Sequence, residues 1–316
     1  MMDANHCRMI LTLTLLPAVL NLPPLRAHDL DGVGVFLSIV AATEGQSQVQ
    51  IREEDGYRFI QSNGLPDHVT GRFPNRNNPN RIEAQTYQFR VPLFPQANRD
   101  STAVGMNLFG VALNGVPFDA AAAEFWRGDR RWQYEALSGA VNLGLDDSNA
   151  HVQPNGAYHY HGLPTALVRR LTRPDSMILI GYAADGFPVY AMFGHSDPLD
   201  PDSSLRKMKS GYRLRTGTRP DGPGGAYDGS FVQDYEFAGD DDTLDECNGR
   251  FGVTPEFREG VYHYFVTDTF PFIPRQLKGT MDPSFRKGPP NGQNGPPPGR
   301  GRRPPGPAPG FPPPPR

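Results

Sequence analysis

The chain has 316 residues, enough for one large domain or two ordinary ones, and its 35 glycines and 34 prolines favour short strands and turns over long helices. The formal net charge is −3, and setting aside the four arginines of residues 288–316 leaves −7 for the rest of the chain. This acidic remainder excludes a basic nucleic-acid-binding core, so no nucleic-acid partner is expected.

Residues 1–27 have the pattern of a cleaved export signal. Arg8 precedes an apolar run at residues 9–20, and Leu25-Arg26-Ala27 is a suitable cleavage sequence. The run is too short to cross a bilayer comfortably, which favours a signal peptide over an anchor and predicts no transmembrane segment in the mature chain. We therefore expect an exported protein, periplasmic or extracellular.

Cleavage after Ala27 would make His28 the first residue, where the amine and the imidazole together chelate copper. Cleavage would also remove Cys7 and leave Cys247 as the one remaining cysteine. A single cysteine forms neither an intramolecular disulfide framework nor a thiolate metal cluster.

The elements predicted along residues 28–287 are mainly short strands. Alternating or continuous apolar residues predict strands within residues 48–60, 82–91, 104–113, 177–193, 212–216, 230–237 and 260–267. Short helices are predicted at residues 120–125, capped by Asp119, and at residues 163–171, and the acidic residues 240–246 are suited to a helix start. We expect a mainly β, single domain, an antiparallel β-sandwich or jelly-roll-like fold with a few short helices.

Two segments have no periodic pattern. Residues 62–80 form a loop dense in turn formers, with His68 as its only histidine, and such long loops are usually either functional or disordered. Residues 288–316 are rich in proline, glycine and arginine, and this composition predicts a disordered tail.

The most informative stretch is Ala157-Tyr158-His159-Tyr160-His161-Gly162. The chain has eight histidines, and three of them fall within residues 151–161. Side chains alternate between the two faces of a strand, so His159 and His161 share one face and Tyr158 and Tyr160 share the other.

The turn before this strand decides where His151 lies. Pro154-Asn155-Gly156 suits a three-residue hairpin loop, a type I turn followed by a left-handed glycine. A two-residue Asn-Gly turn would place Pro154 at a pairing position that requires a backbone N–H. The three-residue loop sets His151 opposite His159 on the same face, whereas a slip of one residue would send it to the other face.

A second strand resembles the first. Residues 260–265 read Gly-Val-Tyr-His-Tyr-Phe and match residues 156–161 at four of six positions. If the two strands lie in one sheet, or face each other across a sandwich, His263 becomes a fourth candidate for the site of His151, His159 and His161.

Three converging histidines predict a divalent transition-metal site. Neutral imidazole suits zinc, copper, iron and nickel, and three protein ligands leave a position for a further ligand. Zinc or copper is favoured over iron because no carboxylate is clearly placed to complete a set of two histidines and one carboxylate.

Two other interpretations remain open. In the first, the histidines are packed strand residues without a metal. The protein is then a non-catalytic surface module that binds a glycan, another small molecule or a protein. In the second, His159 or His161 is the general base of a metal-free hydrolase, oriented by Asp147 or Asp245. No Gly-x-Ser-x-Gly or His-Glu-x-x-His motif supports another catalytic class.

The Tyr158-His159-Tyr160-His161 sequence resembles the motif from which the YHYH domain family takes its name. Similar stretches occur at residues 63–68, 73–75, 114–118, 181–188, 222–225, 245–250 and 262–264. The resemblance covers about residues 48–275 and implies a single domain of an exported protein. It implies no substrate, because the family consists largely of exported proteins without an established reaction.

Overall fold

The computed structural model describes residues 37–41 and 46–288 of the chain. The predicted signal peptide of residues 1–27, the hypothetical copper site at His28 and residues 289–316 of the predicted tail lie outside the described residues. Within the part that the structure describes, no helix has the length and apolar character needed to cross a membrane.

The first sheet is antiparallel and has four strands in the order β1-β2-β3-β4. They are β1 (Leu37–Ala41), β2 (Ser47–Glu54), β3 (Tyr57–Ser62) and β4 (Tyr87–Pro92). Asp55 and Gly56 join β2 to β3 with φ values of 50° and 77°, as a two-residue hairpin turn requires. The strands predicted within residues 48–60 are confirmed, and they pair as a hairpin. The strand predicted over 82–91 begins later, because the backbone N–H of Glu83 donates to Gly156 instead of to a neighbouring strand.

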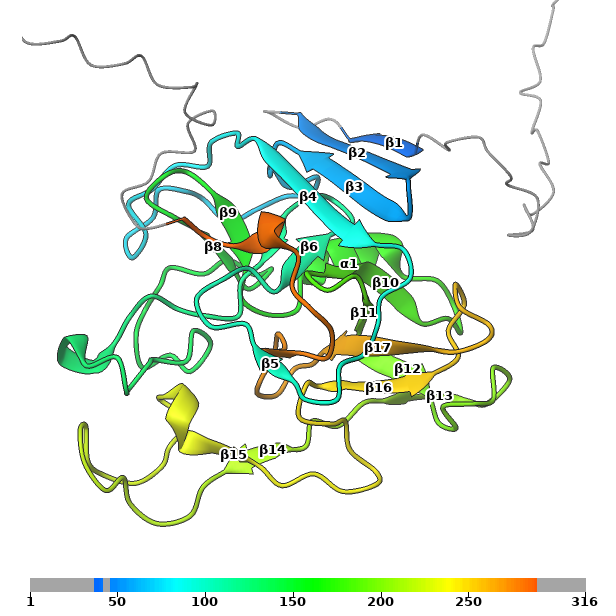
Figure 1. Cartoon of the computed structure of the whole chain (residues 1–316). Helices are drawn as coiled ribbons and strands as arrows, with labels where there is room; N and C mark the ends of the chain where they lie inside the picture. Colours follow the sequence, from blue (N-terminus) through cyan, green and yellow to red (C-terminus); the bar gives the residue numbers. More distant parts are fainter. Residues whose placement is uncertain (1–36, 42–45, 289–316) are drawn as a thin grey trace, which may run out of the picture. The chain divides into compact units, whose positions relative to one another are not determined.

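The second sheet has eight strands and carries the histidine hairpin (Figure 1). In sheet order they are β16 (Gly249–Gly252), β17 (Val261–Val266), β11 (Pro188–Ala191), β10 (Ile178–Ala183), β6 (Gly110–Ala112), β7 (Pro117–Phe118), β9 (Tyr158–Tyr160) and β8 (Ala150–Val152). The pairings of β11 with β17 and of β7 with β9 are parallel, and the others are antiparallel. This large sheet is therefore mixed, not purely antiparallel as expected from the sequence.

The remaining elements are short. Three two-stranded sheets pair β12 (Phe193–His195) with β13 (Leu205–Lys207), β14 (Tyr212–Leu214) with β15 (Tyr235–Phe237), and β5 (Thr102–Ala103) with β18 (Gln276–Leu277). The helix α1 (Thr165–Leu171) is accompanied by the 3-10 turns η1 (Trp126–Gly128), η2 (Val232–Asp234) and η3 (Pro283–Phe285).

Two of the predicted helices do not form. Residues 120–125 are not helical, because the Asp119 carboxylate accepts the N–H of Ala121 in a local turn and forms an ion pair with Lys287. Residues 240–246 form a turn in which Thr243 donates to the Asp240 carbonyl. The helix predicted at 163–171 is confirmed as α1.

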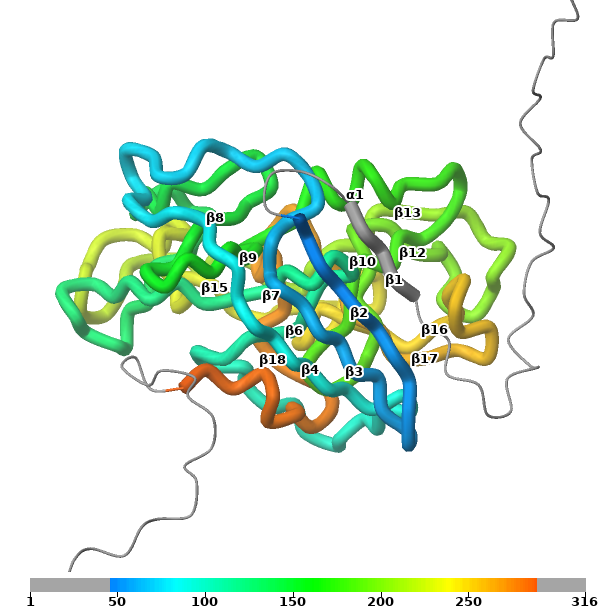
Figure 2. Tube along the Cα trace, turned by 90° about the horizontal axis from the view of Figure 1, so that it is seen from above, coloured from blue at the N-terminus to red at the C-terminus, as the bar shows by residue number. Residues whose placement is uncertain are grey.

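The two large sheets share one hydrophobic core. Figure 2 shows β2, β3 and β4 passing over the middle strands of the eight-stranded sheet. Burying each large apolar side chain contributes about 1.5–3 kcal/mol, so this shared core is the main stabilising contact between the sheets. A mainly β fold with few short helices, whose described residues belong to one compact unit, is confirmed. Buried members of the core include Val49, Ile60, Phe89 and Val91 from the smaller sheet and Val111, Tyr160, Ile180, Val189 and Tyr264 from the larger one.

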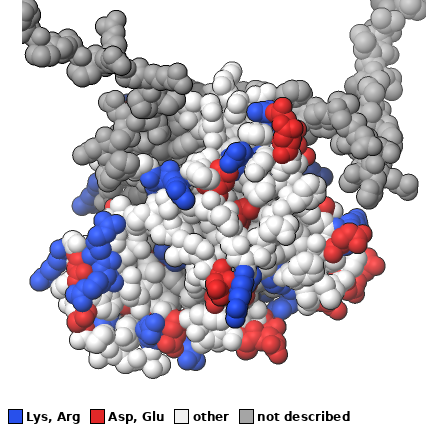
Figure 3. Space-filling view, in the orientation of Figure 1, with Lys and Arg blue, Asp and Glu red and all other residues white. Residues whose placement is uncertain are grey.

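Most charged side chains lie at the surface. On the face in Figure 3, Lys and Arg are interspersed with Asp and Glu. The side chains of pairs such as Arg213 with Glu236, 3.1 Å apart, keep 69% and 33% of their surface exposed. Exposed pairs of this kind contribute about 0–1 kcal/mol. Arg219 and Asp234 differ, since they are 8% and 0% exposed and Arg219 Nε donates to the carboxylate at 2.7 Å.

Candidate metal centre

The hairpin of β8 and β9 has the register expected from its turn. His151 pairs with His159, and Val152 pairs with Tyr158. The N–H of Gly156 donates to Gln153 at 2.9 Å, and Gly156 has a φ of 84°, so the loop is the predicted type I turn with a left-handed glycine. The prediction that His151 lies opposite His159 is confirmed.

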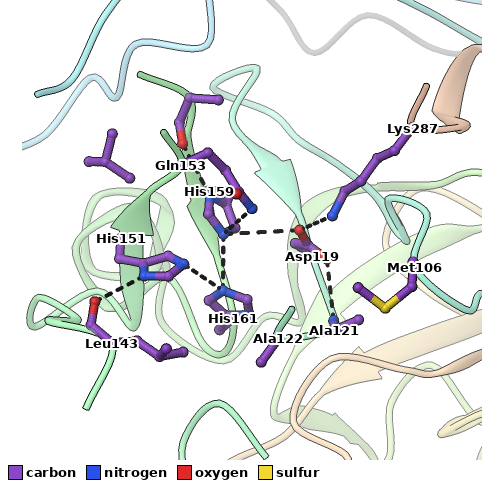
Figure 4. A network of polar contacts seen from close by, with 12 residues as sticks. Met106, Asp119, Ala121, Ala122, Leu143, His151, Gln153, His159, His161 and Lys287 are labelled. Carbon is purple, nitrogen blue, oxygen red and sulfur yellow. Dashed lines mark hydrogen bonds and ion pairs between the residues drawn. The ribbon is translucent and has the colours of Figure 1, made fainter. Parts of the chain in front are cut away.

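The three imidazoles converge on one point through their Nε2 atoms (Figure 4). His161 Nε2 lies 3.0 Å from His159 Nε2 and 3.1 Å from His151 Nε2. Zinc bonds to imidazole nitrogen at about 2.0–2.1 Å, which in tetrahedral geometry separates two such ligands by about 3.3 Å. The observed spacing therefore fits a single metal ion held by three histidines.

Hydrogen bonds at the opposite ring nitrogens fix two of these imidazoles. His151 Nδ1 lies 3.0 Å from the Leu143 carbonyl oxygen, and His159 Nδ1 lies 3.1 Å from that of Ala157. A carbonyl only accepts, so each Nδ1 carries the proton and each Nε2 presents a lone pair to the shared point. Metal-ligating histidines usually have this arrangement.

A proton on the third imidazole, His161, cannot satisfy the lone pairs of both other rings. His161 Nδ1 is buried without a hydrogen-bond partner among the described residues. If His161 Nε2 carries a proton, this N–H can donate a well-aligned hydrogen bond to only one of the two neighbouring Nε2 atoms. A bound cation satisfies all three lone pairs together.

Burial sets the protonation state of the cluster. His159 and His161 are 2% and 3% exposed, and His151 is partly buried. Desolvation holds the pKa of His159 and of His161 well below the ordinary imidazole value, and it lowers the pKa of His151 as well. All three rings are therefore neutral at neutral pH, which is the form that binds metals.

A carboxylate that sequence reasoning missed lies beside the cluster. Asp119 follows β7, is 1% exposed and has its Oδ2 atom 4.0 Å from His159 Nε2. Burial raises its pKa, and the ion pair with Lys287 opposes that rise. The local sequence pattern predicts a helix cap at Asp119, and Asp147 and Asp245 are the acids considered from the sequence as partners of the histidines. The parallel pairing of β7 with β9, which brings Asp119 here, has no local sequence signal.

The two tyrosines anchor the other face of β9. Both are 0% exposed. The Tyr158 hydroxyl donates to Asp146 at 2.7 Å. The Tyr160 hydroxyl accepts a bond of 2.9 Å from Asn114 Nδ2 and lies 2.7 Å from His68 Nε2. These bonds fix the strand and thereby the direction of the histidines on its opposite face.

The loop of residues 62–80 packs onto the same hairpin. His68 contacts Tyr160, and Asn78, which is 4% exposed, donates from Nδ2 to the Val152 carbonyl at 3.0 Å. Of the two possibilities that such a long loop offers, the structure shows an ordered segment that supports the site.

The structure does not bring His263 to the cluster. His263 lies on β17, and the four strands β11, β10, β6 and β7 separate β17 from β9. Its Nδ1 atom lies 2.9 Å from the Val261 carbonyl oxygen, and its ring packs against Tyr190 and Phe265. Of the two arrangements considered from the sequence, one sheet or opposite layers of a sandwich, the structure shows one sheet, but strands of one sheet need not be adjacent.

The fold and the cluster define a mainly β protein with a buried three-histidine centre. A family model described as YHYH protein matches residues 88–279, which include every strand of the eight-stranded sheet. Because this match covers more than half of the chain, the chain belongs to the YHYH protein family. The matched region begins at residue 88, whereas the resemblance noted in the sequence begins near residue 48. No curated protein and no solved structure matches the chain.

Substitution of Gly156 by alanine is expected to destabilise the fold by about 1–3 kcal/mol. Its φ of 84° disfavours any residue with a Cβ, and an added Cβ would lie 2.5 Å from that of Glu83. The strained turn would displace His151, so metal affinity should fall too. Denaturant unfolding and metal titration measure the two effects.

Gly139 provides the matched control for Gly156. It has a φ of 76°, and an added Cβ would meet nothing within 4 Å. Gly139→Ala should therefore leave metal affinity unchanged. Equal metal affinities for Gly156→Ala and the wild type would contradict the role of the turn.

Substitution of Asn78 by alanine is expected to weaken metal binding by roughly 10-fold to 100-fold, the usual effect of losing a group that orients a ligand. Asn78 holds β8 in place through Val152, next to His151. Competition with a chromophoric chelator measures the affinity. Asn77→Ala, at an exposed neighbour, should have no effect, and a similar loss in both variants would show that Asn78 has no specific role.

Proposed function

We propose that this protein binds a divalent transition metal, zinc or copper, through the Nε2 atoms of His151, His159 and His161. The observation that carries the proposal is the convergence of three neutral imidazole nitrogens, from two buried histidines and one partly buried histidine, within 4.8 Å of one another. His159 Nε2 lies 3.4 Å from Gln153 Nε2, but one proton on His161 cannot bridge all three Nε2 atoms, whereas a bound cation accepts a lone pair from each of them. His263, which was included in the sequence hypothesis, is not part of this ligand set.

The donor set supports zinc or copper. Three neutral imidazoles suit both ions, and a site with three protein ligands retains a position for one more ligand. Asp119 is the carboxylate nearest to His159, and we propose that it is either that further ligand or the group that orients it. A bound ion would supply Lewis-acid polarisation there.

A cavity beside the cluster supports a small-molecule partner. Its volume is about 610 Å³, within the range typical of ligand sites. Leu143 and Asn149 line it, and their carbonyl oxygens accept hydrogen bonds from His151 Nδ1 and from the N–H of His161. Leucines, Phe272 and the neutral Thr165 and Thr267 also line the cavity. Its one charged lining residue, Asp268, forms an ion pair with Lys207, so we propose a neutral small molecule or glycan as the ligand.

Elemental analysis tests the metal proposal. Protein produced through an export pathway and purified without chelators should contain about one zinc or copper ion per chain. A chain without stoichiometric metal would contradict the proposal. Glycan binding that persists in metal-free protein and in His159→Ala would instead support a surface module in which the histidines are structural.

We also propose that residues 1–27 direct export to the periplasm or the cell exterior and that residues 28–287 are the mature YHYH domain. The charged start, the short apolar run and the small residue at position 27 support this proposal. N-terminal sequencing of protein recovered outside the cytoplasm should begin at His28. Recovery only from the cytoplasm, with Met1 or Met2 at the start, would contradict it.

A further inference from the structure

The eight-stranded sheet has two halves with the same connectivity. The first half is β6-β7-β9-β8 and the second is β10-β11-β17-β16, and in each the successive pairings are antiparallel, parallel and antiparallel. The halves meet at the antiparallel pair of β6 and β10.

The central pair is symmetric about its middle residues. Val111 pairs with Tyr182, and the flanking pairs are Gly110 with Ala183 and Ala112 with Gly181. If Gly110 corresponds to Gly181 and Ala112 to Ala183, exchanging the halves turns each flanking pair into the other. This reciprocity is the signature of a twofold axis.

The inner hairpins agree with that correspondence. Asn114-Gly115 and Asp185-Gly186 form the two turns, and both glycines have positive φ, 76° and 95°. The side chain at the first turn position bonds to a tyrosine hydroxyl in each half. Asn114 donates to Tyr160 at 2.9 Å, and Asp185 accepts from Tyr264 at 2.5 Å.

The outer hairpins match in the segments that lead into them. Asp146 accepts from the N–H of Ser148 and from the hydroxyl of Tyr158, while Asp245 accepts from Cys247 and Tyr262 in the same way. The asparagines three residues later share a left-handed backbone. Asn149 and Asn248 have φ values of 54° and 56°, and their carbonyls accept the N–H groups of His161 and Phe265 at 2.7 and 2.9 Å.

The same alignment assigns a counterpart to each of the three histidines. His159 corresponds to His263, because both Nδ1 atoms lie close to the carbonyl oxygen two residues earlier, at 3.1 and 2.9 Å. His151 pairs with His159 across its hairpin as Arg250 pairs with His263. His161 corresponds to Phe265, two residues further along the strand.

We propose that the sheet arose by internal duplication and that the hairpin of β16 and β17 retains the scaffold of a second divalent-metal site, inactive in this chain because Arg250 and Phe265 replace two ligands. The inference rests on the proposed metal function of the first site. His263 is 0% exposed, and its Nε2 atom has no hydrogen-bond partner among the described residues, so the one retained ligand still presents a free nitrogen. The Arg250 guanidinium donates to the His195 carbonyl at 2.6 Å and places positive charge where a metal would need a lone pair.

The test is the metal content of the full-length double variant R250H/F265H, loaded with zinc and desalted. We expect about two zinc ions per chain, compared with about one in the wild type. The control R250Q/F265L removes the same two side chains without adding imidazoles and should bind about one. A folded R250H/F265H protein that binds no more zinc than this control would overturn the inference, whereas a wild type without zinc would count against the first site.

If R250H/F265H does not fold, the opposite pair of substitutions in the first hairpin tests whether the two hairpins are equivalent. The variant H151R/H161F gives the first hairpin the residues that the second one accommodates. We expect it to unfold in a cooperative transition and to bind no zinc. Failure of H151R/H161F to fold, together with failure of R250H/F265H, would overturn the equivalence of the two hairpins.

Discussion

Replacement of His161 by alanine is expected to abolish stoichiometric metal binding, with a loss of affinity greater than about 100-fold. Changes in groups that only orient a ligand cost about 10-fold to 100-fold, and the removal of one of three direct ligands costs more. His161 Nε2 lies within 3.1 Å of both other Nε2 atoms, and no further histidine of the described residues lies in the cluster to take its place. Isothermal titration of chelator-stripped protein with zinc and with copper measures the loss.

His263→Ala is the matched control for His161→Ala. His263 is a buried histidine in the same sheet, on the strand equivalent to β9, and it lies away from the cluster. The control should bind the metal as tightly as the wild type. Equal losses in both variants would show that general destabilisation, and not removal of a ligand, explains the effect.

Replacement of Asp234 by alanine is expected to lower the free energy of unfolding by about 3–5 kcal/mol, because it removes the buried carboxylate and leaves Arg219 with the exposed Asp228 as its remaining carboxylate partner among the described residues. Asp234 is 0% exposed and accepts from Arg219 Nε at 2.7 Å and from the N–H groups of Gly229 and Phe231 at 3.0 and 3.2 Å. Chemical denaturation monitored by tryptophan fluorescence measures the change.

Glu236→Ala is the control for the buried pair. Glu236 lies two residues from Asp234, is partly exposed and pairs with the exposed Arg213 at 3.1 Å. Its loss should cost no more than about 1 kcal/mol. If Asp234→Ala and Glu236→Ala lower the free energy of unfolding equally, burial does not make the Arg219–Asp234 pair more stabilising than an exposed pair.

The hairpin that carries the site was predictable because its determinants are local. Pro154, Asn155 and Gly156 select one loop length, and that length fixes the register of His151 against His159. The alternation of side chains along a strand then places His161 on the same face. Three of the four candidate ligands follow from these two rules alone.

The residues that the sequence did not reveal are brought in by long-range pairing. Asp119 reaches the cluster because β7 runs parallel to β9, and Asn78 reaches it because a loop folds back over β8. Neither contact has a sequence signature, and the local pattern at Asp119 favoured a helix cap. Such long-range contacts are also why the order of the eight strands could not be predicted.

The match between Tyr262-His263-Tyr264 and Tyr158-His159-Tyr160 does not indicate a fourth ligand, but it does mark structurally equivalent strands. It suggested a fourth ligand, yet four strands separate the two sites. The matching turns, asparagine conformations and tyrosine hydrogen bonds show that the two similar segments occupy equivalent positions in the two halves of one sheet. Sequence similarity therefore identified the repeat without indicating the distance between its copies.

Anomalous diffraction from crystals of the wild-type protein loaded with zinc is the most direct test of the central claim. Data collected on both sides of the zinc absorption edge should show one strong peak bonded to the Nε2 atoms of His151, His159 and His161 at about 2.0–2.1 Å. No such peak is expected beside His263. A difference map without density among the three imidazoles, or with zinc only at surface residues, would contradict the account.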